Sequence, residues 1–356
     1  MSKIIRFRHD VLDPAPSGGR HDICLVGDLA GNGRNDIVIG AKQGDPNLFW
    51  YENPSWKRHS IATAPNLEAG GVLVDVTGNG CLDIVAGQQV GGHNLYWFEH
   101  PDDPRQPWPV YLIEDRFEKY HDQAAGDVDG DGETEIVVLS QKSRVLAYYD
   151  IPPDPRVSPW PCQCCRIVDD DFDGEGVLVT DIDGDGAAEI LAGTNIYRPP
   201  TDKGGRWRRE PFAVGYTKTR VAVGDLNQDG RLEIVLCEGE SDDAKLAWIA
   251  QPDWVPTLLR RDLSHPHSLA VADFNGDGLP DIFLGEMGSA KNPKPRLFIY
   301  LNRGDGAFEE VLISEGISTH EAKAADLTGN GLPDIVGKPY AESGRIDVWW
   351  NETGRG

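Results

Sequence analysis

The sequence has no long apolar segment and comparatively few basic residues. No run of 18 apolar residues occurs, and the N-terminal segment MSKIIRFRHDVLD lacks the apolar core of a signal peptide. We therefore expect no membrane span and a cytoplasmic location for the chain as given, or a secreted one if its start is processed. The 34 Lys and Arg residues face 58 Asp and Glu residues, for a formal net charge of -24. This charge argues against nucleic acid and anionic membranes as partners, because phosphate contacts need a basic surface.

Cysteine and the common catalytic motifs are also scarce. Three of the six cysteines crowd into the segment CQCC, and the others have no partner-like spacing, so we expect free thiols rather than a disulfide or a zinc site. The sequence contains no G-x-S-x-G, no G-x-x-x-x-G-K and no G-x-G-x-x-G followed by a helix. No known motif therefore indicates serine hydrolysis, phosphoryl transfer or dinucleotide binding.

Glycine, proline and one repeated acidic phrase are abundant. The 41 Gly and 25 Pro residues favour many short strands over long helices. Seven segments share one pattern: GDLAGNGRNDIVIG, VDVTGNGCLDIVAG, GDVDGDGETEIVVL, TDIDGDGAAEILAG, GDLNQDGRLEIVLC, ADFNGDGLPDIFLG and ADLTGNGLPDIVGK. Their first aspartates, Asp28 to Asp326, are spaced by 44 to 54 residues. Such a period suits the four-stranded blade of a β-propeller.

Each repeat contains the signals of four strands. Two β runs flank the acidic loop, an aromatic run such as NLFWYENP follows, and an outer run such as WKRHSIA ends the repeat. We predict an all-β fold, a seven-bladed β-propeller of four-stranded antiparallel blades that forms a single domain over residues 1–356. The blades should begin near residues 20, 69, 120, 174, 217, 266 and 319.

The last repeat ends on a third-strand phrase, RIDVWWNETGRG, and lacks an outer run. Residues 4–12 resemble the outer runs, so we expect them to pair into the last blade and close the ring, which removes exposed sheet edges. The alternative is an open array of β-modules, which leaves both terminal strands unexplained.

Aromatic residues recur in the third-strand phrases, and we expect them to pack between blades. Aromatics that stack on a sugar would come instead from irregular turns, such as Tyr197, Trp207 or Tyr340. The fourth repeat is the most irregular, because TNIYRPPTDKGGRWRREPFAV lacks the aromatic third-strand phrase and inserts a basic Gly-containing loop.

The acidic loops follow the spacing D-x-[DN]-x-[DN]-G-x-x-[DE], which supplies the oxygen ligands that calcium prefers. Four loops are complete: Asp127, Asp129, Asp131 and Glu135; Asp181, Asp183, Asp185 and Glu189; Asp225, Asn227, Asp229 and Glu233; Asp273, Asn275, Asp277 and Asp281. We expect structural calcium there. Three loops have Ala30, Thr77 or Thr328 at the third position and should be held by hydrogen bonds or bind weakly. The alternative for every loop is a plain turn without metal.

If the acidic loops lie at one end of the blades, the segments that enter the first strands should gather at the other end, around the mouth of a channel. Turns between second and third strands should reach the same mouth. Convergent titratable groups in a concave space indicate an active site. The catalytic candidates are His121, His267, His320, Arg220, Lys323 and Tyr340. The substrate-binding candidates are His21, His93, Gln88, Gln141, Glu175, Tyr197, His265, Glu286 and Lys338.

With these loops and phrases such as YHDQAAGDVDGDG, HPHSLAVADFNGDG and THEAKAADLTGNG, the chain resembles the FG-GAP or VCBS repeat proteins. That family includes integrin α-subunit propellers, propeller polysaccharide lyases of the rhamnose-glucuronate type and aldos-2-ulose dehydratase. The resemblance implies a His-rich mouth that removes the proton beside a uronate carboxylate or a keto group. It implies acid–base roles for His121, His267 and His320, and charge neutralisation by Arg220 and Lys323.

We therefore expect a lyase or dehydratase that performs β-elimination on a uronate-containing saccharide, in a protein that is a monomer. Imidazoles that exchange protons near neutral pH and cations that stabilise an enolate fit this chemistry. One alternative is a non-catalytic propeller that binds a carbohydrate or a protein. Another is a glycoside hydrolase that uses Glu175 and a second mouth carboxylate. A second divalent metal at the mouth is a further alternative.

Overall fold

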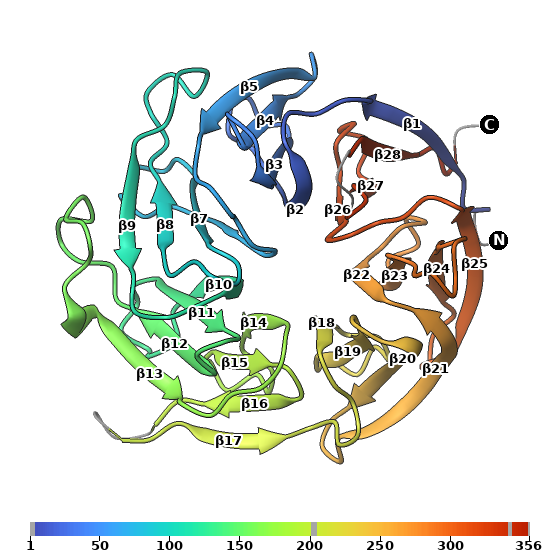
Figure 1. Ribbon diagram of the computed structural model, residues 1–356. Helices are drawn as coiled ribbons and strands as arrows, with labels where there is room; N and C mark the ends of the chain where they lie inside the picture. The colour runs from blue at the N-terminus through green and yellow to red at the C-terminus, as the bar shows by residue number, and fades with distance from the viewer. Residues whose placement is uncertain (1–3, 201–204, 341–343, 355–356) are drawn as a thin grey trace. The chain divides into compact units, whose positions relative to one another are not determined.

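The computed structural model describes residues 4–200, 205–340 and 344–354. In these residues 28 β-strands and one short 3-10 helix, Cys162–Cys164, make up the secondary structure. The strands form seven antiparallel sheets of four strands each (Figure 1). This confirms the predicted all-β fold, a β-propeller with seven four-stranded blades. The chain divides into two compact units, Ser17–Pro211 and Met1–Pro16 with Phe212–Gly356.

The unit Ser17–Pro211 contains four blades, each built from four consecutive strands. The first is β2 (Gly19–Gly27), β3 (Asp36–Gln43), β4 (Leu48–Glu52) and β5 (Lys57–Ala62), and the second is β6 (Val72–Val74), β7 (Asp83–Gly87), β8 (Leu95–Phe98) and β9 (Val110–Glu114). The third is β10 (Tyr120–Gly126), β11 (Glu135–Ser140), β12 (Val145–Tyr149) and β13 (Cys165–Asp169), and the fourth is β14 (Val177–Thr180), β15 (Glu189–Ala192), β16 (Asn195–Arg198) and β17 (Arg208–Pro211).

The other unit contains three blades. The fifth is β18 (Thr219–Gly224), β19 (Glu233–Glu238), β20 (Asp242–Ala250) and β21 (Val255–Ser264), and the sixth is β22 (Pro266–Ala272), β23 (Asp281–Glu286), β24 (Arg296–Asn302) and β25 (Phe308–Glu315). The seventh is β26 (Lys323–Ala325), β27 (Asp334–Gly337), β28 (Ile346–Asn351) and β1 (Phe7–Asp13).

The N-terminal strand β1 is the fourth strand of the seventh blade. It pairs antiparallel with β28, with Phe7 opposite Asn351 and His9 opposite Trp349. The prediction that the start of the chain completes the last blade is confirmed, although the strand begins at Phe7 and ends at Asp13.

The first two strands of a blade form a hairpin, and the acidic loop is its turn. In the third blade Gly126 lies opposite Glu135 beside this loop, whereas Tyr120 lies opposite Ser140 at the far end of the hairpin. The carboxylate at the ninth loop position is buried and accepts backbone N–H groups, as Glu135 does from Val128 at 2.8 Å. The strand starts, which carry most of the candidate site residues, therefore lie at the end of the hairpin opposite the acidic loop.

Third-strand aromatics fill the cores between neighbouring blades. Trp50, Trp97 and Trp349 have no exposed surface. Trp97 of the second blade shares a core with Ile136 and Val138 of the third blade. The predicted packing role is confirmed for these residues. In the fourth blade Tyr197 lies in the third strand, β16, and is 1% exposed, although this repeat lacks the aromatic phrase of the others.

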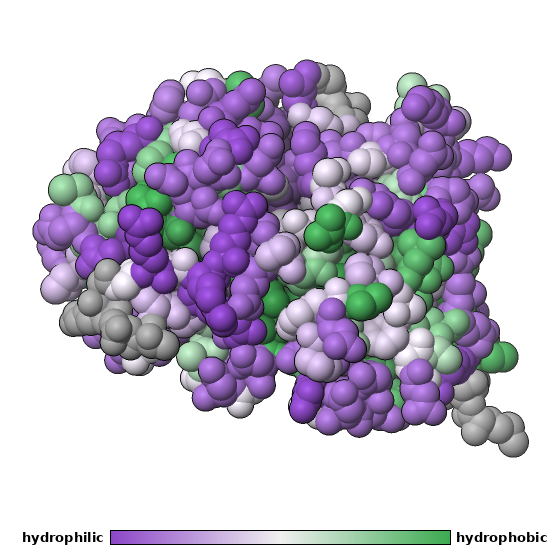
Figure 2. Space-filling model, turned by 90° about the horizontal axis from the view of Figure 1, so that it is seen from below, coloured by the Kyte–Doolittle hydropathy of each residue, from purple (hydrophilic) through white to green (hydrophobic). Residues whose placement is uncertain are grey.

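The surface is mostly polar. In Figure 2 hydrophilic residues cover most of the visible face, and hydrophobic residues form only small patches. All six cysteines lie in the described ranges and are free thiols, as predicted. No helix in the described ranges has the length and apolar character needed to cross a membrane.

Candidate functional site

The unit with blades five to seven gathers eight polar side chains at the strand ends opposite its acidic loops. We call these residues the basic cluster: Arg220, Glu240, His267, His320, Glu321, Lys323, Lys338 and Tyr340. They come from the starts of β18, β22 and β26 and from the turns after β19 and β27. Within this unit the structure brings together the predicted residues Arg220, His267, His320, Lys323, Lys338 and Tyr340.

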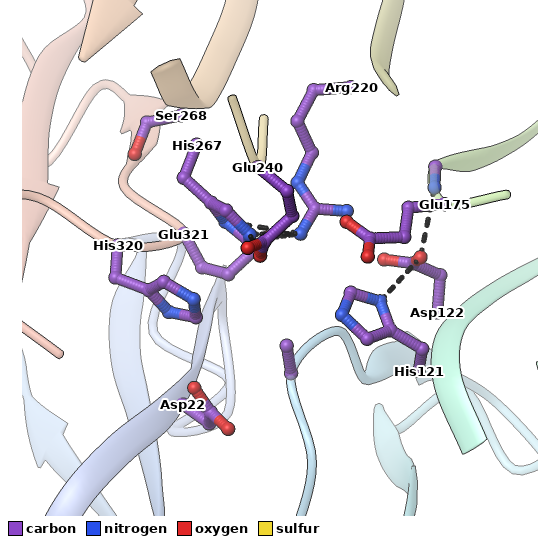
Figure 3. Close-up of polar contacts among 12 residues, drawn as sticks. Asp22, His121, Asp122, Glu175, Arg220, Glu240, His267, Ser268, His320 and Glu321 are labelled. Atoms are coloured by element: carbon purple, nitrogen blue, oxygen red, sulfur yellow. Dashed lines mark hydrogen bonds and ion pairs between the residues drawn. The ribbon is translucent and has the colours of Figure 1, made fainter. Parts of the chain in front are cut away.

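His267 is the centre of the basic cluster and is 1% exposed. Its Nε2 lies 2.9 Å from Oε1 of Glu240, and its Nδ1 lies 3.2 Å from Oε1 of Glu321. The guanidinium of Arg220 lies within 3.1 Å of both ring nitrogens (Figure 3). His267 therefore lies between two carboxylates and one guanidinium.

His320 stacks on His267, with ring centroids 4.1 Å apart and an interplanar angle of 21°. Nζ of Lys338 donates to the carbonyl oxygen of His320 at 2.7 Å and lies 3.4 Å from its Nδ1. Burial, followed by the charges of His267 and Lys338, lowers the pKa of His320 well below 6.5. His320 is therefore neutral at neutral pH and can accept a proton.

Glu321 connects the cations of the basic cluster. Its Oε1 lies 3.0 Å from Arg220, and its Oε2 lies 3.2 Å from Nζ of Lys323. Burial raises the pKa of Glu321, but Arg220, Lys323 and His267 outweigh burial and hold that pKa well below 4.5. Glu321 therefore stays ionised and fixes both cations in place.

The basic cluster has a buried floor and an exposed edge. Lys338 has no exposed surface, whereas Tyr340 is 39% exposed and packs its ring 5.1 Å from that of His320. The side chains of Lys323 and Glu240 are 38% and 33% exposed. Within the described residues of this unit, the basic cluster combines three permanent cations and two imidazoles with the carboxylates of Glu240 and Glu321, in a chain that carries a net charge of -24. Such a local excess of cations favours an anionic group.

The unit with blades one to four holds a buried ion triad at the equivalent strand ends. Nζ of Lys42 lies 2.7 Å from Oδ2 of Asp22 and 3.2 Å from Oε1 of Glu68. All three residues are at most 7% exposed. Burial raises the pKa of Glu68, but the charges of His121, Lys42 and Lys119 outweigh burial. The pKa of Glu68 therefore lies below its usual value. Lys42 therefore pairs with two buried carboxylates, and Glu68 stays ionised.

The same unit holds a histidine–aspartate pair. Nδ1 of His121 lies 2.8 Å from Oδ2 of Asp122, and that oxygen also accepts the backbone N–H of Gly176 at 2.9 Å (Figure 3). With Nδ1 donating to Asp122, Nε2 is the basic nitrogen of His121. Gly70 passes so close that a Cβ there would meet the carbonyl oxygen of His121 at 2.5 Å.

Gln141 and Glu175 form a second contact in this unit, with Nε2 of Gln141 donating to Oε1 of Glu175 at 2.7 Å. His21 contacts the carbonyl oxygen of Ser17 at 2.8 Å. Gln88 bonds to the backbone of Pro65 and Asn94 and so holds a turn. His93 lies in the turn between β7 and β8 and is exposed.

Three predicted binding residues lie apart from these groups. Tyr197 lies inside β16 and not in a turn, and its hydroxyl donates to Asp169 at 2.7 Å, so its predicted placement is wrong. Glu286 is paired with Arg296 at 2.7 Å. His265 lies 3.6 Å from Asp242.

Sequence reasoning missed Lys42 and Glu240. Lys42 lies near the end of β3 and Glu240 lies just after β19, so both stand at the turns between second and third strands where other candidates were predicted. Because side chains alternate along a strand, the choice between neighbours depends on the register.

The carboxylates of the third acidic loop lie close together. Ligand oxygens of Asp127, Asp129 and Asp131 lie within 4.8 Å of one another. Burial, reinforced by the three aspartates, raises the pKa of Glu135 to about 7. In the sixth loop the buried side-chain oxygen of Asn275 has no protein partner within the described ranges. Calcium would satisfy both groups.

Comparisons with known proteins agree with this fold. The FG-GAP-like repeat family matches residues 273–337. Cartilage acidic protein 1 of Xenopus tropicalis is 24% identical in an alignment 280 residues long that covers 65% of this chain and 42% of that protein. The chain thus spans about two fifths of the length of this relative.

Solved structures resemble nearly the whole chain. BBS1N in complex with ARL6DN has a TM-score of 0.59 at 10% identity, covering 98% of this chain and 97% of that chain. The V. cholerae biofilm matrix protein Bap1 has a TM-score of 0.53 at 11% identity, covering 98% and 92%. The exotype rhamnogalacturonan lyase YesX has a TM-score of 0.54 at 13% identity, covering 93% and 74%. Together with the sheet topology, these matches identify the chain as a seven-bladed β-propeller that contains an FG-GAP-like repeat.

Proposed function

We propose that the protein is a carbohydrate lyase that performs β-elimination on a uronate-containing saccharide, with the basic cluster as its active site. The observation that carries this proposal is the cation-rich cluster in a strongly acidic chain. An anionic sugar is a ligand that such a cluster can hold while the rest of the surface repels it. The fold similarity to a rhamnogalacturonan lyase supports the same reaction class.

In the proposed reaction, Lys323 at the exposed edge and Arg220 behind it neutralise the uronate carboxylate. This charge balance favours removal of the proton on the carbon beside the carboxylate, because the resulting enolate bears additional negative charge. His320, neutral because of its lowered pKa, accepts that proton. The electron pair forms the carbon–carbon double bond, the β carbon–oxygen bond breaks, and the Tyr340 hydroxyl or His267 protonates the leaving oxygen. Glu321 and Glu240 act as positioning residues.

The test is a scan of uronate-containing oligosaccharides for an unsaturated product that absorbs in the near ultraviolet. His320→Ala and Tyr340→Phe should each reduce turnover by about 10²–10⁴-fold, the usual contribution of an acid or base. Lys323→Met should weaken substrate binding and turnover together. Unchanged turnover in the His320 variant would refute the assignment.

His121 and Asp122 are the second acid–base candidate, since Asp122 sets the His121 tautomer as a carboxylate does in a catalytic triad. Asp122→Asn should then reduce turnover as strongly as His121→Ala. A loss confined to these two variants would move the chemistry to the Ser17–Pro211 unit.

Two other outcomes select the alternatives. New reducing ends without an unsaturated product would indicate a glycoside hydrolase, for which Glu175 is the candidate carboxylate. Saturable binding without turnover across the library would indicate a non-catalytic binding propeller.

We also propose structural calcium in three of the four complete loops, held by Asp127, Asp129, Asp131 and Glu135 in the third blade and by the equivalent residues of the fifth and sixth blades. The clustered oxygens of the third loop and the buried oxygen of Asn275 support this. Calcium would add a cross-link within each loop and would not contact substrate. A second divalent metal near the basic cluster stays a prediction.

A further inference from the structure

The fourth acidic loop differs from the other complete loops in what faces its carboxylates. Arg198, the last residue of β16, places Nη1 2.5 Å from Oδ2 of Asp183 and 2.6 Å from Oε1 of Glu189. Its Nε donates to Glu210 at 3.0 Å, which fixes the guanidinium from a second side. The side chain of Arg198 is only 16% exposed. The loop is therefore closed by an arginine of its own blade.

The distances from this nitrogen to the two carboxylate oxygens match those of calcium to its ligands. Calcium lies about 2.3–2.6 Å from its oxygen ligands. Oxygens of Asp181, Asp183 and Glu189 lie within 4.8 Å of one another, as a shared ion requires. A nitrogen at 2.5 and 2.6 Å from two of these oxygens fills that space, and its positive charge repels a second cation.

The strand register makes this arrangement particular to the fourth blade. The last paired residue of β15 is Ile190, opposite Tyr197, so Arg198 stands opposite Glu189. The equivalent positions in the other blades, in chain order, are Glu52, Glu99, Asp150, Ala250, Leu301 and Trp350, none of which is basic.

The third and fourth loops are both accessible to ions from solvent. A pocket of about 790 Å³ is lined by Asp183, Glu189 and Arg198 as well as by Asp129 of the third loop. Ions in solvent can therefore reach both loops. The fourth loop is distinguished by its compensating charge, because Arg198 pairs with both Asp183 and Glu189.

We propose that Arg198 is a built-in replacement for calcium in the fourth acidic loop, so that this loop folds without metal although its sequence matches the calcium pattern. The proposal narrows the four expected calcium loops to three, and it rests on calcium binding by the other complete loops.

The test counts calcium ions per chain, by native mass spectrometry of the full-length protein after chelation and re-addition of calcium. Asp129→Asn should lose one ion relative to the wild type, and Asp183→Asn should lose none. Arg198→Met should gain one ion, and adding Asp183→Asn to it should remove that ion again. Arg208→Met, which removes a nearby exposed arginine, is the matched control and should leave the count unchanged.

Loss of an ion in Asp183→Asn alone, or no gain in Arg198→Met, would overturn the proposal. The single variant Asp183→Asn keeps Arg198. The ion count of this variant therefore tests the proposal even if Arg198→Met fails to fold. If calcium binding by the other loops fails, the wild type and Asp129→Asn both carry no ion. A gain from none to one in Arg198→Met would then still support the replacement.

Discussion

His320 stacks on His267 at 4.1 Å, and the burial of that stack keeps His320 unprotonated in the folded protein. The unfolded chain takes up a proton near pH 6.5, and the folded chain does not. Stability is therefore complete above this pH and is lost as the pH falls below it, with a slope of at most about 1.4 kcal/mol per pH unit.

His320→Gln should flatten the pH dependence of unfolding between pH 7 and pH 5. Urea unfolding at several pH values measures this, and the range stays above the region where the ionised Glu321 contributes its own acid sensitivity. His93→Gln, at an exposed position, is the control and should keep the wild-type slope. Equal slopes for wild type and His320→Gln would contradict the buried neutral imidazole.

Lys42 should be essential to the stability of the Ser17–Pro211 unit. Lys42→Met leaves Asp22 and Glu68 buried without their cation and should cost about 3–5 kcal/mol of unfolding free energy. The exposed Lys142→Met should change it by less than about 0.5 kcal/mol. Adding Asp22→Asn to Lys42→Met should recover part of the loss. An unchanged free energy of unfolding in Lys42→Met would show that the two carboxylates do not depend on Lys42.

A glycine should be required for stability at position 70, because the backbone of β10 lies too close for a side chain. Gly70→Ala combines a positive φ of 85° with a Cβ 2.5 Å from the carbonyl oxygen of His121. Gly91→Ala has almost the same φ, 83°, with nothing within 4 Å, and therefore measures the backbone strain alone, about 1 kcal/mol. The thermal unfolding midpoint of Gly70→Ala should be well below that of Gly91→Ala. Similar midpoints would mean that β10 yields without cost.

Calcium removal should lower the thermal midpoint. A site with calcium at about 100 times its Kd contributes about 2.7 kcal/mol, and in a chain of this size each kcal/mol corresponds to a few degrees. Calorimetry in calcium and in EGTA measures the difference between the two thermal midpoints. This difference should be smaller in Asp129→Asn than in the wild type. Asp129 is suited to this test because Asp127 and Asp131 hold the turn N–H groups. Identical midpoints with and without EGTA would exclude structural calcium.

The fold was predictable because its determinants are local and repeated. Each acidic loop makes one hairpin, and each third-strand aromatic such as Trp97 fills one inter-blade core, so seven copies specify seven blades. The fourth blade misled the prediction because NIYR contains a single aromatic, and only its pairing with β15 shows Tyr197 as a strand residue.

The site was predictable only in part. That strand starts would bring Arg220, His267 and His320 together follows from the repeat. The partners of these residues do not, because Glu240 and Lys42 are selected by register and side-chain direction. The contact of Arg198 with the fourth loop depends on a cross-strand position that the loop pattern does not include.

The pairing of β1 with β28 has a consequence for folding kinetics. Arg8 and Glu352, joined at 2.8 Å, are 344 residues apart in sequence, whereas strands elsewhere pair with their neighbours along the chain. Closing so long a loop costs conformational entropy before any contact compensates for it. On a ribosome, six blades can form from residues already synthesised, and the seventh must wait for the C-terminal strand. The last stage of refolding should therefore be the docking of β1 on β28.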